Sequence, residues 1–443
     1  MGVEQSDKEA VQWFTKAAGQ GYPRAQQLLG ECYDNGYGVE QDGAKAYELY
    51  LKSHEAGFPA GTCALGLCYE LGIGVEADPA RAVEFYRQAA EAGFVRAQCN
   101  LGYCYYHAIG VQEDNEEAAK WFAKAAQAGQ PRAQQLLGEC YEHGHGVEKN
   151  MERAVELYRK AHEQHYPSGT CSLGVCYEYG QGVEVDKAKA VQLYKEAAEQ
   201  GNMWAQCNYG FCLYQGIGLD EDEAEAVVWF RKAADQGSAR AHFLLGECHE
   251  YGLGVEKNVS EAARLYAIAH EKGYPSGTCA LGLCYELGQG VEQDKDKARD
   301  LYIQAANRGN ARAQCNLGFF YYHGIAVEQD GKLAAEWFAK SANQGFHRAE
   351  ALLAECYEKG VGVEQNLDQA LELYRKAADS GRKDAQEALE RLTGGQGAPA
   401  PEKPKMEAKA PAVRPEPKAP SAPAQPHREE KKRKGWWPFG KKK

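Results

Sequence analysis

Apolar residues recur along this chain in short helical patterns separated by polar loops. Ala25, Leu29 and Tyr33 are spaced by four residues, so they share one side of a helix predicted over 22–35. Equivalent positions in later segments repeat the same spacing. The pattern therefore predicts one core-facing stripe on each helix of this kind, which we call helix A.

A second helix, helix B, is predicted over 42–56 after a polar loop over 36–41. Its core-facing positions have mostly alanine, aromatic or aliphatic counterparts in later segments; in the first copy they are Ala46, Leu49, Tyr50 and Ser53. Two antiparallel helices of this size cannot cover their own apolar faces, so each pair must stack on the next. We expect an all-α, right-handed superhelical solenoid of about ten 36-residue helix-turn-helix repeats.

The residues at the two ends of helix B support the prediction of helix pairs. The second helix always opens with Asp or Asn, which can accept from the free N–H groups of its first turn; these residues are Asp42, Asp78, Asp114, Asn150, Asp186, Asp222, Asn258, Asp294, Asp330 and Asn366. A glycine, able to adopt the left-handed conformation, closes helix B at a spacing of 36 that only His165 interrupts; these glycines are Gly21, Gly57, Gly93, Gly129, Gly201, Gly237, Gly273, Gly309, Gly345 and Gly381.

Two positions of helix A accept only small residues. Counterparts of Ala25 are Ala or Gly, and counterparts of Gly30 are Gly or Ala. Small residues let neighbouring helices approach closely. We expect a larger residue there to cost about 1–3 kcal/mol by overpacking.

A longer period of 108 residues overlies the repeat. Residues 23–32 return almost unchanged at 131–140 and recognisably at 239–248. Three unit types, whose first copies begin at Gly21, Gly57 and Gly93, therefore follow one another in a fixed order. We call one set of three successive units a cassette. Triplication of one cassette is the simplest history.

The domain boundaries follow from the repeat and from composition. We expect a repeat domain over 1–393, made of a half repeat (1–20), full repeats (21–380) and a capping helix (382–393), then a Pro/Ala/Lys-rich disordered linker (394–430) and a basic aromatic tail (431–443). The half repeat is either a natural cap or the start of a fragment; both readings stay open.

The motif Ala-x3-Leu-Gly-x2-Tyr-x2-Gly-x-Gly-Val, followed by Asp and then Lys-Ala-Ala before Gly, closely resembles the Sel-one-like repeat family, which is related to tetratricopeptide repeats. The resemblance covers residues 2 to about 393. It implies a scaffold or adaptor for protein–protein contacts. The resemblance also implies two alternatives to the scaffold function. One is an exported host-interaction protein, and the other is a β-lactam-binding hydrolase of a Cys-rich branch whose cysteine spacing this chain does not match.

Charge divides the chain into two parts. Residues 1–393 carry 38 basic and 58 acidic side chains, whereas residues 394–443 carry 13 basic and 5 acidic ones. An acidic body repels phosphates, so nucleic-acid binding by the repeats is disfavoured. The N-terminus shows neither a signal-peptide pattern nor an apolar stretch long enough to span a bilayer, so we expect a cytoplasmic protein.

Residues with potential chemistry follow the repeat rather than any catalytic arrangement. His54, His162 and His270 are 108 residues apart on equivalent turns, which favours packing. Gly72-Ile73-Gly74 follows a helix and lacks a third glycine, so it indicates a turn. The fifteen cysteines are expected to be buried, reduced and structural, with a cross-repeat bridge such as Cys68–Cys99 as the minority alternative. We therefore predict no enzymatic activity, no metal and no cofactor.

Partner docking is predicted on one face of helix A. The positions that vary most between units are those of Arg24, Leu28, Glu31 and Asn35, and these share one side of the helix. We expect the A helices to line a concave wall, where the third unit type offers the aromatics, arginines and amides typical of interface hot spots. The predicted partner-binding residues are Arg96, Asn100, Tyr103, His107, Trp204, Asn208, Phe211, Gln215, Arg312, Asn316, Phe319 and His323.

The tail combines basic and aromatic residues. Basic side chains flanking Trp and Phe favour docking on an anionic membrane surface or on an acidic partner. Solubilisation is the alternative role, and the basic run would also serve as a nuclear import signal in a eukaryote. The predicted docking residues are Lys431, Lys432, Arg433, Lys434, Trp436, Trp437 and Phe439.

Overall fold

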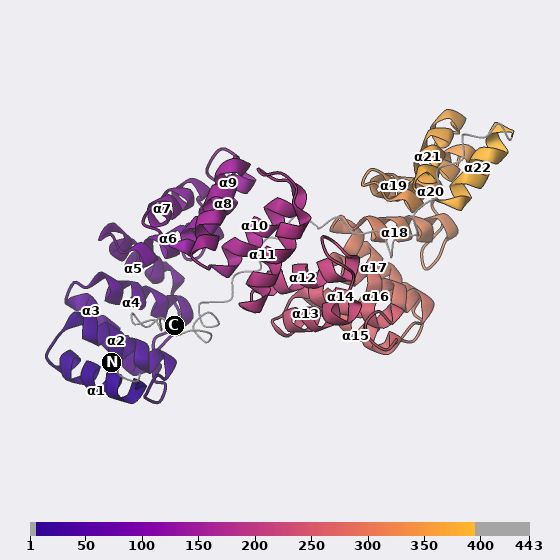
Figure 1. Ribbon diagram of the computed structural model, residues 1–443. Coiled ribbons are helices and arrows are strands. Elements are labelled where there is room, and N and C mark those ends of the chain that lie inside the picture. Colours follow the sequence, from indigo (N-terminus) through magenta and orange to yellow (C-terminus); the bar gives the residue numbers. More distant parts are fainter. Residues whose placement is uncertain (1–5, 395–443) are drawn as a thin grey trace. The chain divides into compact units, whose positions relative to one another are not determined.

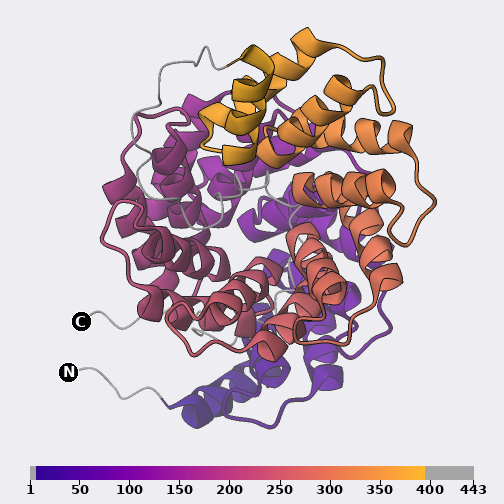
Figure 2. The same ribbon diagram turned by 90° about the vertical axis from the view of Figure 1, so that its right-hand side faces the viewer.

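The computed structural model describes residues 6–394, and these form 22 helices and no strand (Figure 1). The chain divides between Gln200 and Gly201 into two compact units. In both, consecutive helices pack side by side and are joined by short loops (Figures 1 and 2). The prediction of an all-helical array of stacked helix pairs is confirmed.

The first unit holds one B helix followed by five complete A/B pairs. Its helices are α1 (Asp7–Gly19), α2 (Pro23–Asn35), α3 (Gly43–Glu55), α4 (Pro59–Leu71), α5 (Pro79–Glu91), α6 (Val95–His107), α7 (Asn115–Gln127), α8 (Pro131–His143), α9 (Met151–Glu163), α10 (Pro167–Tyr179) and α11 (Lys187–Glu199).

The second unit holds five pairs and a final A helix. Its helices are α12 (Met203–Gln215), α13 (Glu223–Asp235), α14 (Ala239–Tyr251), α15 (Val259–Glu271), α16 (Pro275–Leu287), α17 (Lys295–Asn307), α18 (Ala311–His323), α19 (Gly331–Ala342), α20 (His347–Lys359), α21 (Leu367–Asp379) and α22 (Lys383–Thr393). Even-numbered helices are A helices and odd-numbered ones are B helices throughout the chain.

Capping sets the helix boundaries as the sequence predicts. Every Asp or Asn that opens a complete B helix accepts from the backbone N–H three residues later, as Asp78 does from Arg81 at 3.1 Å. The repeating glycines after helix B have positive φ, and His165 adopts the same conformation with φ 57°. Ala108 and Ala326 are two further non-glycine residues with positive φ, at loop positions where most units place glycine.

The small residue near the middle of helix A lies against an aromatic ring of helix B. A Cβ atom built on Gly30 would lie 2.6 Å from Cε1 of Tyr50, and one on Gly102 would lie 2.8 Å from Cδ1 of Phe122. Phe122 is among the largest fully buried side chains of the described chain, and Tyr50 is also buried. The expected close approach of helices is therefore an approach of ring to backbone.

The residue at this aromatic position of helix B depends on the unit type. In the second unit type it is a tyrosine whose hydroxyl donates to a glutamate near the end of helix A, as Tyr86 does to Glu70 at 2.5 Å and Tyr302 to Glu286 at 2.6 Å. In the third type the pair becomes a phenylalanine beside a tyrosine, such as Phe338 with Tyr322 at 6.3 Å between ring centroids. Both residues change together, so each pair stays matched.

A second pair of residues changes together where helix B of one pair meets helix A of the next, a contact that we call a seam. His54 Nδ1 lies 2.9 Å from Thr62 Oγ1, and the equivalent His162–Thr170 and His270–Thr278 pairs are 3.0 Å apart. Other seams have Ala in place of the histidine, and the residue in place of the threonine is then usually Gln. Its amide donates to the alanine carbonyl, as Gln314 does to Ala306 at 3.2 Å. The packing role predicted for these histidines is confirmed.

All fifteen cysteines are buried and none is bonded to another. Burial raises the pKa of the Cys63, Cys140 and Cys279 thiols to about 12. A thiol with so high a pKa carries almost no thiolate at neutral pH and is a poor nucleophile. The cysteines therefore behave as small core residues.

Candidate protein-interaction face

The predicted partner-binding residues lie on three A helices of the third unit type. Each helix contributes four: Arg96, Asn100, Tyr103 and His107 come from α6, Trp204, Asn208, Phe211 and Gln215 from α12, and Arg312, Asn316, Phe319 and His323 from α18. Because α6 belongs to the first compact unit and the other two helices to the second, each helix is described by itself.

These residues differ greatly in exposure. Trp204 is the most exposed large apolar side chain among them, with 47% of its surface accessible. His323 is also exposed, whereas Asn100, Tyr103 and Asn316 are buried and the others are half-buried. The three buried side chains add little surface of their own, so the face is made mainly by their neighbours.

Arginines from the following A helix cover the aromatic rings of this face. The guanidinium of Arg240 lies 4.9 Å from the Phe211 ring centroid and donates to Oδ1 of Asn208 at 2.8 Å. Arg348 likewise lies over the Phe319 ring at 5.5 Å and donates to Asn316 at 3.3 Å.

The first cassette has the same stacking, with Arg132 over Tyr103 at 4.8 Å. The sequence prediction missed these arginines as part of the face, although the recurrence of Arg at the first-type positions equivalent to Arg24 was a visible signal. Stacked guanidinium groups make the face partly cationic and hold its rings in place.

Carboxylates accompany the arginines. Burial raises the pKa of the Glu247 carboxyl on α14 to about 7, while Arg312 opposes the shift and Glu250 adds to it. Arg312 from α18 thus lies within electrostatic reach of two glutamates on α14. The face combines aromatic rings and guanidinium groups, which are enriched at protein interfaces, with carboxylates beside them.

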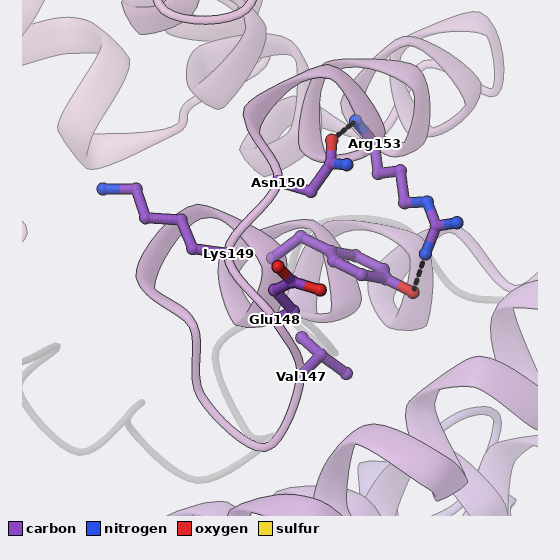
Figure 3. A pocket seen from close by; sticks show the side chains of 6 residues that line it. Val147, Glu148, Lys149, Asn150 and Arg153 are labelled. Atoms are coloured by element: carbon purple, nitrogen blue, oxygen red, sulfur yellow. Dashed lines mark hydrogen bonds between the residues drawn. The ribbon is translucent and has the colours of Figure 1, made fainter.

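A pocket of about 350 Å³ lies beside the loop that precedes α9; Figure 3 shows side chains that line it. Tyr141, Val147 and Arg153 line it, and Arg153 donates to the Tyr141 hydroxyl at 3.4 Å. Lys149 points away from the other labelled side chains in this view (Figure 3). A basic residue of helix B on a tyrosine of helix A also occurs at Lys189–Tyr177 and Lys297–Tyr285, so the pocket is built from contacts that recur in the repeat.

Within residues 6–394, no group of three or more His, Cys, Asp or Glu side chains is arranged to hold a metal ion. None of the helices in this range has the length and apolar character that crossing a membrane requires. The tail residues predicted to dock, 431–439, lie outside the described residues.

Comparison with protein families identifies the repeat. The model of the Sel1 repeat matches eleven consecutive segments, at residues 1–22, 23–58, 59–94, 95–130, 131–166, 167–202, 205–238, 239–274, 275–310, 311–346 and 347–381. The chain belongs to the Sel1 repeat family. Sel1 repeat proteins are generally scaffolds for protein interaction, so the expected class of function is confirmed at this level.

Two solved Sel1 repeat structures illustrate the similarity. A protective antigen present in uropathogenic Escherichia coli strains is 35% identical and covers 86% of this chain and 82% of its own, with a TM-score of 0.61. A Sel1 repeat protein from Oxalobacter formigenes is 33% identical over 55% of this chain and 96% of its own, with a TM-score of 0.49. No curated protein matches the chain.

Proposed function

We propose that this chain is a non-enzymatic scaffold that recruits other proteins to the helix A face of its third unit type. The observation that carries the proposal is the exposure of Trp204. Its equivalents in α6 and α18 are Arg96 and Arg312, so the position does not need an indole for packing. An indole that is half exposed on the same helix as a ring stacked with arginine is typical of an interface anchor.

The test compares Trp204→Arg with the wild-type chain. The substitution restores the residue of the equivalent units, so the fold should be unaffected, with melting temperatures within about 2 °C. Proteins captured from a lysate by tagged wild-type chain should lose at least about tenfold in recovery with Trp204→Arg, because truncating an anchor costs about 2 kcal/mol or more.

Val228→Ala is the matched control. Val228 is 49% exposed on helix B of the same compact unit, so its loss removes a similar type of surface from another face. Equal recovery by Trp204→Arg and wild type, or an equal loss with Val228→Ala, would show that partners dock elsewhere. Unfolding of Phe211→Ala without selective loss of partners would place that ring in the core.

The proposal includes the C-terminal tail as a second contact. The supporting feature is its sequence, in which seven basic residues flank Trp436, Trp437 and Phe439. Cations and interfacial aromatics together favour an anionic membrane surface on the cytoplasmic side. The scaffold would then present its helix A face next to that surface.

A second proposal, export for host interaction, is favoured by the 35% identity to a protein described as a protective antigen. Fractionation of cells that produce the protein from its complete gene distinguishes the two. Recovery outside the cytoplasm supports export, whereas recovery with the cytosol or the inner face of the membrane supports the first proposal. Nitrocefin turnover by the purified chain would instead favour the hydrolase alternative.

A further inference from the structure

The C-terminal ends of α6 and α8 share a continuous cluster of five rings, which we call the ring patch: Tyr103, Tyr106, His107, His143 and His145. Ring centroids lie 4.2 Å apart for Tyr103–His107, 5.0 Å for Tyr106–His107, 5.6 Å for Tyr106–His145 and 5.4 Å for His143–His145. The Tyr106 hydroxyl lies 2.7 Å from Nδ1 of His145. His143 and His145 are exposed, so the patch is accessible to a partner.

The surroundings of the ring patch are electronegative. Both α6 and α8 end there, and a helix C-terminus carries the negative end of the helix dipole. Glu142 Oε1 lies 3.8 Å from Nε2 of His143, and Glu139 lies within electrostatic reach of His107. Ring faces and carboxylates together attract cations.

A later copy of these two helices, α18 and α20, shows what this place accepts. The rings recur there, because Phe319 and Tyr322 lie 4.2 Å and 4.9 Å from His323 between ring centroids. The residue equivalent to His143 is Lys359, whose ammonium group pairs with Glu355, the counterpart of Glu139. The chain therefore places a lysine of its own beside the rings of α18 and a histidine at the same position beside those of α6.

The rings of the patch already accept one guanidinium group. Arg132 stacks on Tyr103 with 4.8 Å from the guanidinium carbon to the ring centroid. Stacking of this kind shows that the face of the Tyr103 ring is oriented for contact with a planar cation. Tyr106, His107 and His145 continue the same cluster of rings.

We propose that the ring patch binds lysine or arginine side chains from a basic segment of a partner protein. The proposal rests on the scaffold function proposed above and specifies the chemistry of one of its partners. Charge complementarity favours this occupant, because residues 1–393 carry 20 more acidic than basic side chains. The partner's cation takes the place that Lys359 occupies beside the equivalent rings of α18.

The experiment measures binding of a fluorescent peptide of alternating Lys and Ala to the full chain by anisotropy. His143→Lys copies the last cassette, so it should fold normally and weaken binding by about tenfold or more, because the new ammonium group competes for the same carboxylates. Lys359→His is the reciprocal control and should strengthen total binding by exposing a second site. A Glu/Ala peptide should not bind.

Three results would overturn the proposal: equal affinity of wild type and His143→Lys, equal affinity for the acidic peptide, or binding that emerges only after deletion of 431–443. The last result would show that the tail, rather than a partner, occupies the patch. Failure here is distinguishable from failure of the scaffold proposal, because the Trp204→Arg capture experiment does not involve the ring patch.

Discussion

Gly66 on α4 and Tyr86 on α5 are in such close contact that a Cβ atom on Gly66 would lie 2.6 Å from Cε1 of the ring. The backbone carbonyl oxygen of Ala82 would lie 3.1 Å from the added Cβ atom, so this atom would meet both the ring and the backbone. This contact recurs in most units, and in the last pair Ala354 stands at the equivalent position. The repeat thus requires a very small residue here.

Gly66→Val should destabilise the first compact unit by about 1–3 kcal/mol, because the side chain cannot fit without moving a buried ring. The midpoint of urea unfolding measures the effect. Gly19→Ala is the control, since an added Cβ there meets nothing within 4 Å. A neutral Gly66→Val would show that the ring has space to move.

Tyr302→Phe should destabilise the second compact unit by about 1–2 kcal/mol, because it removes the hydroxyl that donates to Glu286 at 2.6 Å. Adding Glu286→Tyr converts the pair into the Phe338–Tyr322 combination of the third unit type and should recover most of the loss. A double-mutant cycle in urea measures the coupling. Simple additivity of the two losses would contradict the idea that these residues change as a pair.

The carboxyl of Glu247 should make stability depend on pH. Its pKa is raised from the ordinary 4.5 to about 7, so between these values the folded chain binds more protons than the unfolded chain. Its contribution to stability is therefore lost as pH rises from about 4.5 through 7. Glu247→Gln should raise the melting temperature at pH 8 and leave it unchanged at pH 4.

The exposed Glu256→Gln is the control for that comparison. It should shift the melting temperature little at either pH, because substitutions of exposed side chains usually change stability by no more than about 0.5 kcal/mol. A Glu247→Gln gain of the same size at pH 4 and pH 8 would show that titration of Glu247 does not cause the effect.

Ala326→Gly should stabilise the chain by about 1 kcal/mol. Ala326 has φ 55°, a conformation that places Cβ too close to the carbonyl oxygen that follows it. Other units place glycine here; a Cβ atom on Gly38, for example, would lie 2.5 Å from the carbonyl oxygen of Asp7. Ala123→Gly, on the exposed surface of α7, should change stability in the opposite direction by about 0.5–1 kcal/mol. Thermal unfolding of both variants gives the comparison.

The tail should bind anionic vesicles, and deletion of residues 431–443 should abolish that binding. Rising salt should weaken it, because attraction between exposed charges is screened within about 8 Å at physiological ionic strength. Co-sedimentation with phosphatidylserine-containing vesicles measures both effects. Equal sedimentation of the full and deleted chains would show that the tail is not an anchor.

The sequence predicted the helices almost residue by residue because each boundary has a local cause. Asp42 accepts from the Lys45 N–H at 3.0 Å, and Gly57 has φ 74°, as their positions in the repeat indicate. Neither the stacking of Arg240 on Phe211 nor the contact between Tyr106 and His145 could be predicted in the same way. Both join residues of different units, so they depend on how neighbouring pairs are rotated and spaced, which no local pattern encodes.

The candidate face was predicted by position and not by exposure. Variability between units located it on helix A, but this criterion does not separate the exposed Trp204 from the buried Asn100. Asn100 is variable because its neighbours vary with it: its amide donates toward Cys63 Sγ, 3.9 Å away in the preceding unit. A position that varies between units can therefore lie either on the exposed surface or in a buried contact whose two residues vary together.

The alternation of His–Thr and Ala–Gln seams limits how the gene can change in length. Recombination that removes 36 residues after helix α3 would join His54 to the glutamine-bearing helix α6, leaving the imidazole without its threonine. Removal of 108 residues at the same point would join α3 to α10, which carries Thr170, so the histidine again meets a threonine. Such proteins should therefore gain or lose binding surface in steps of three repeats.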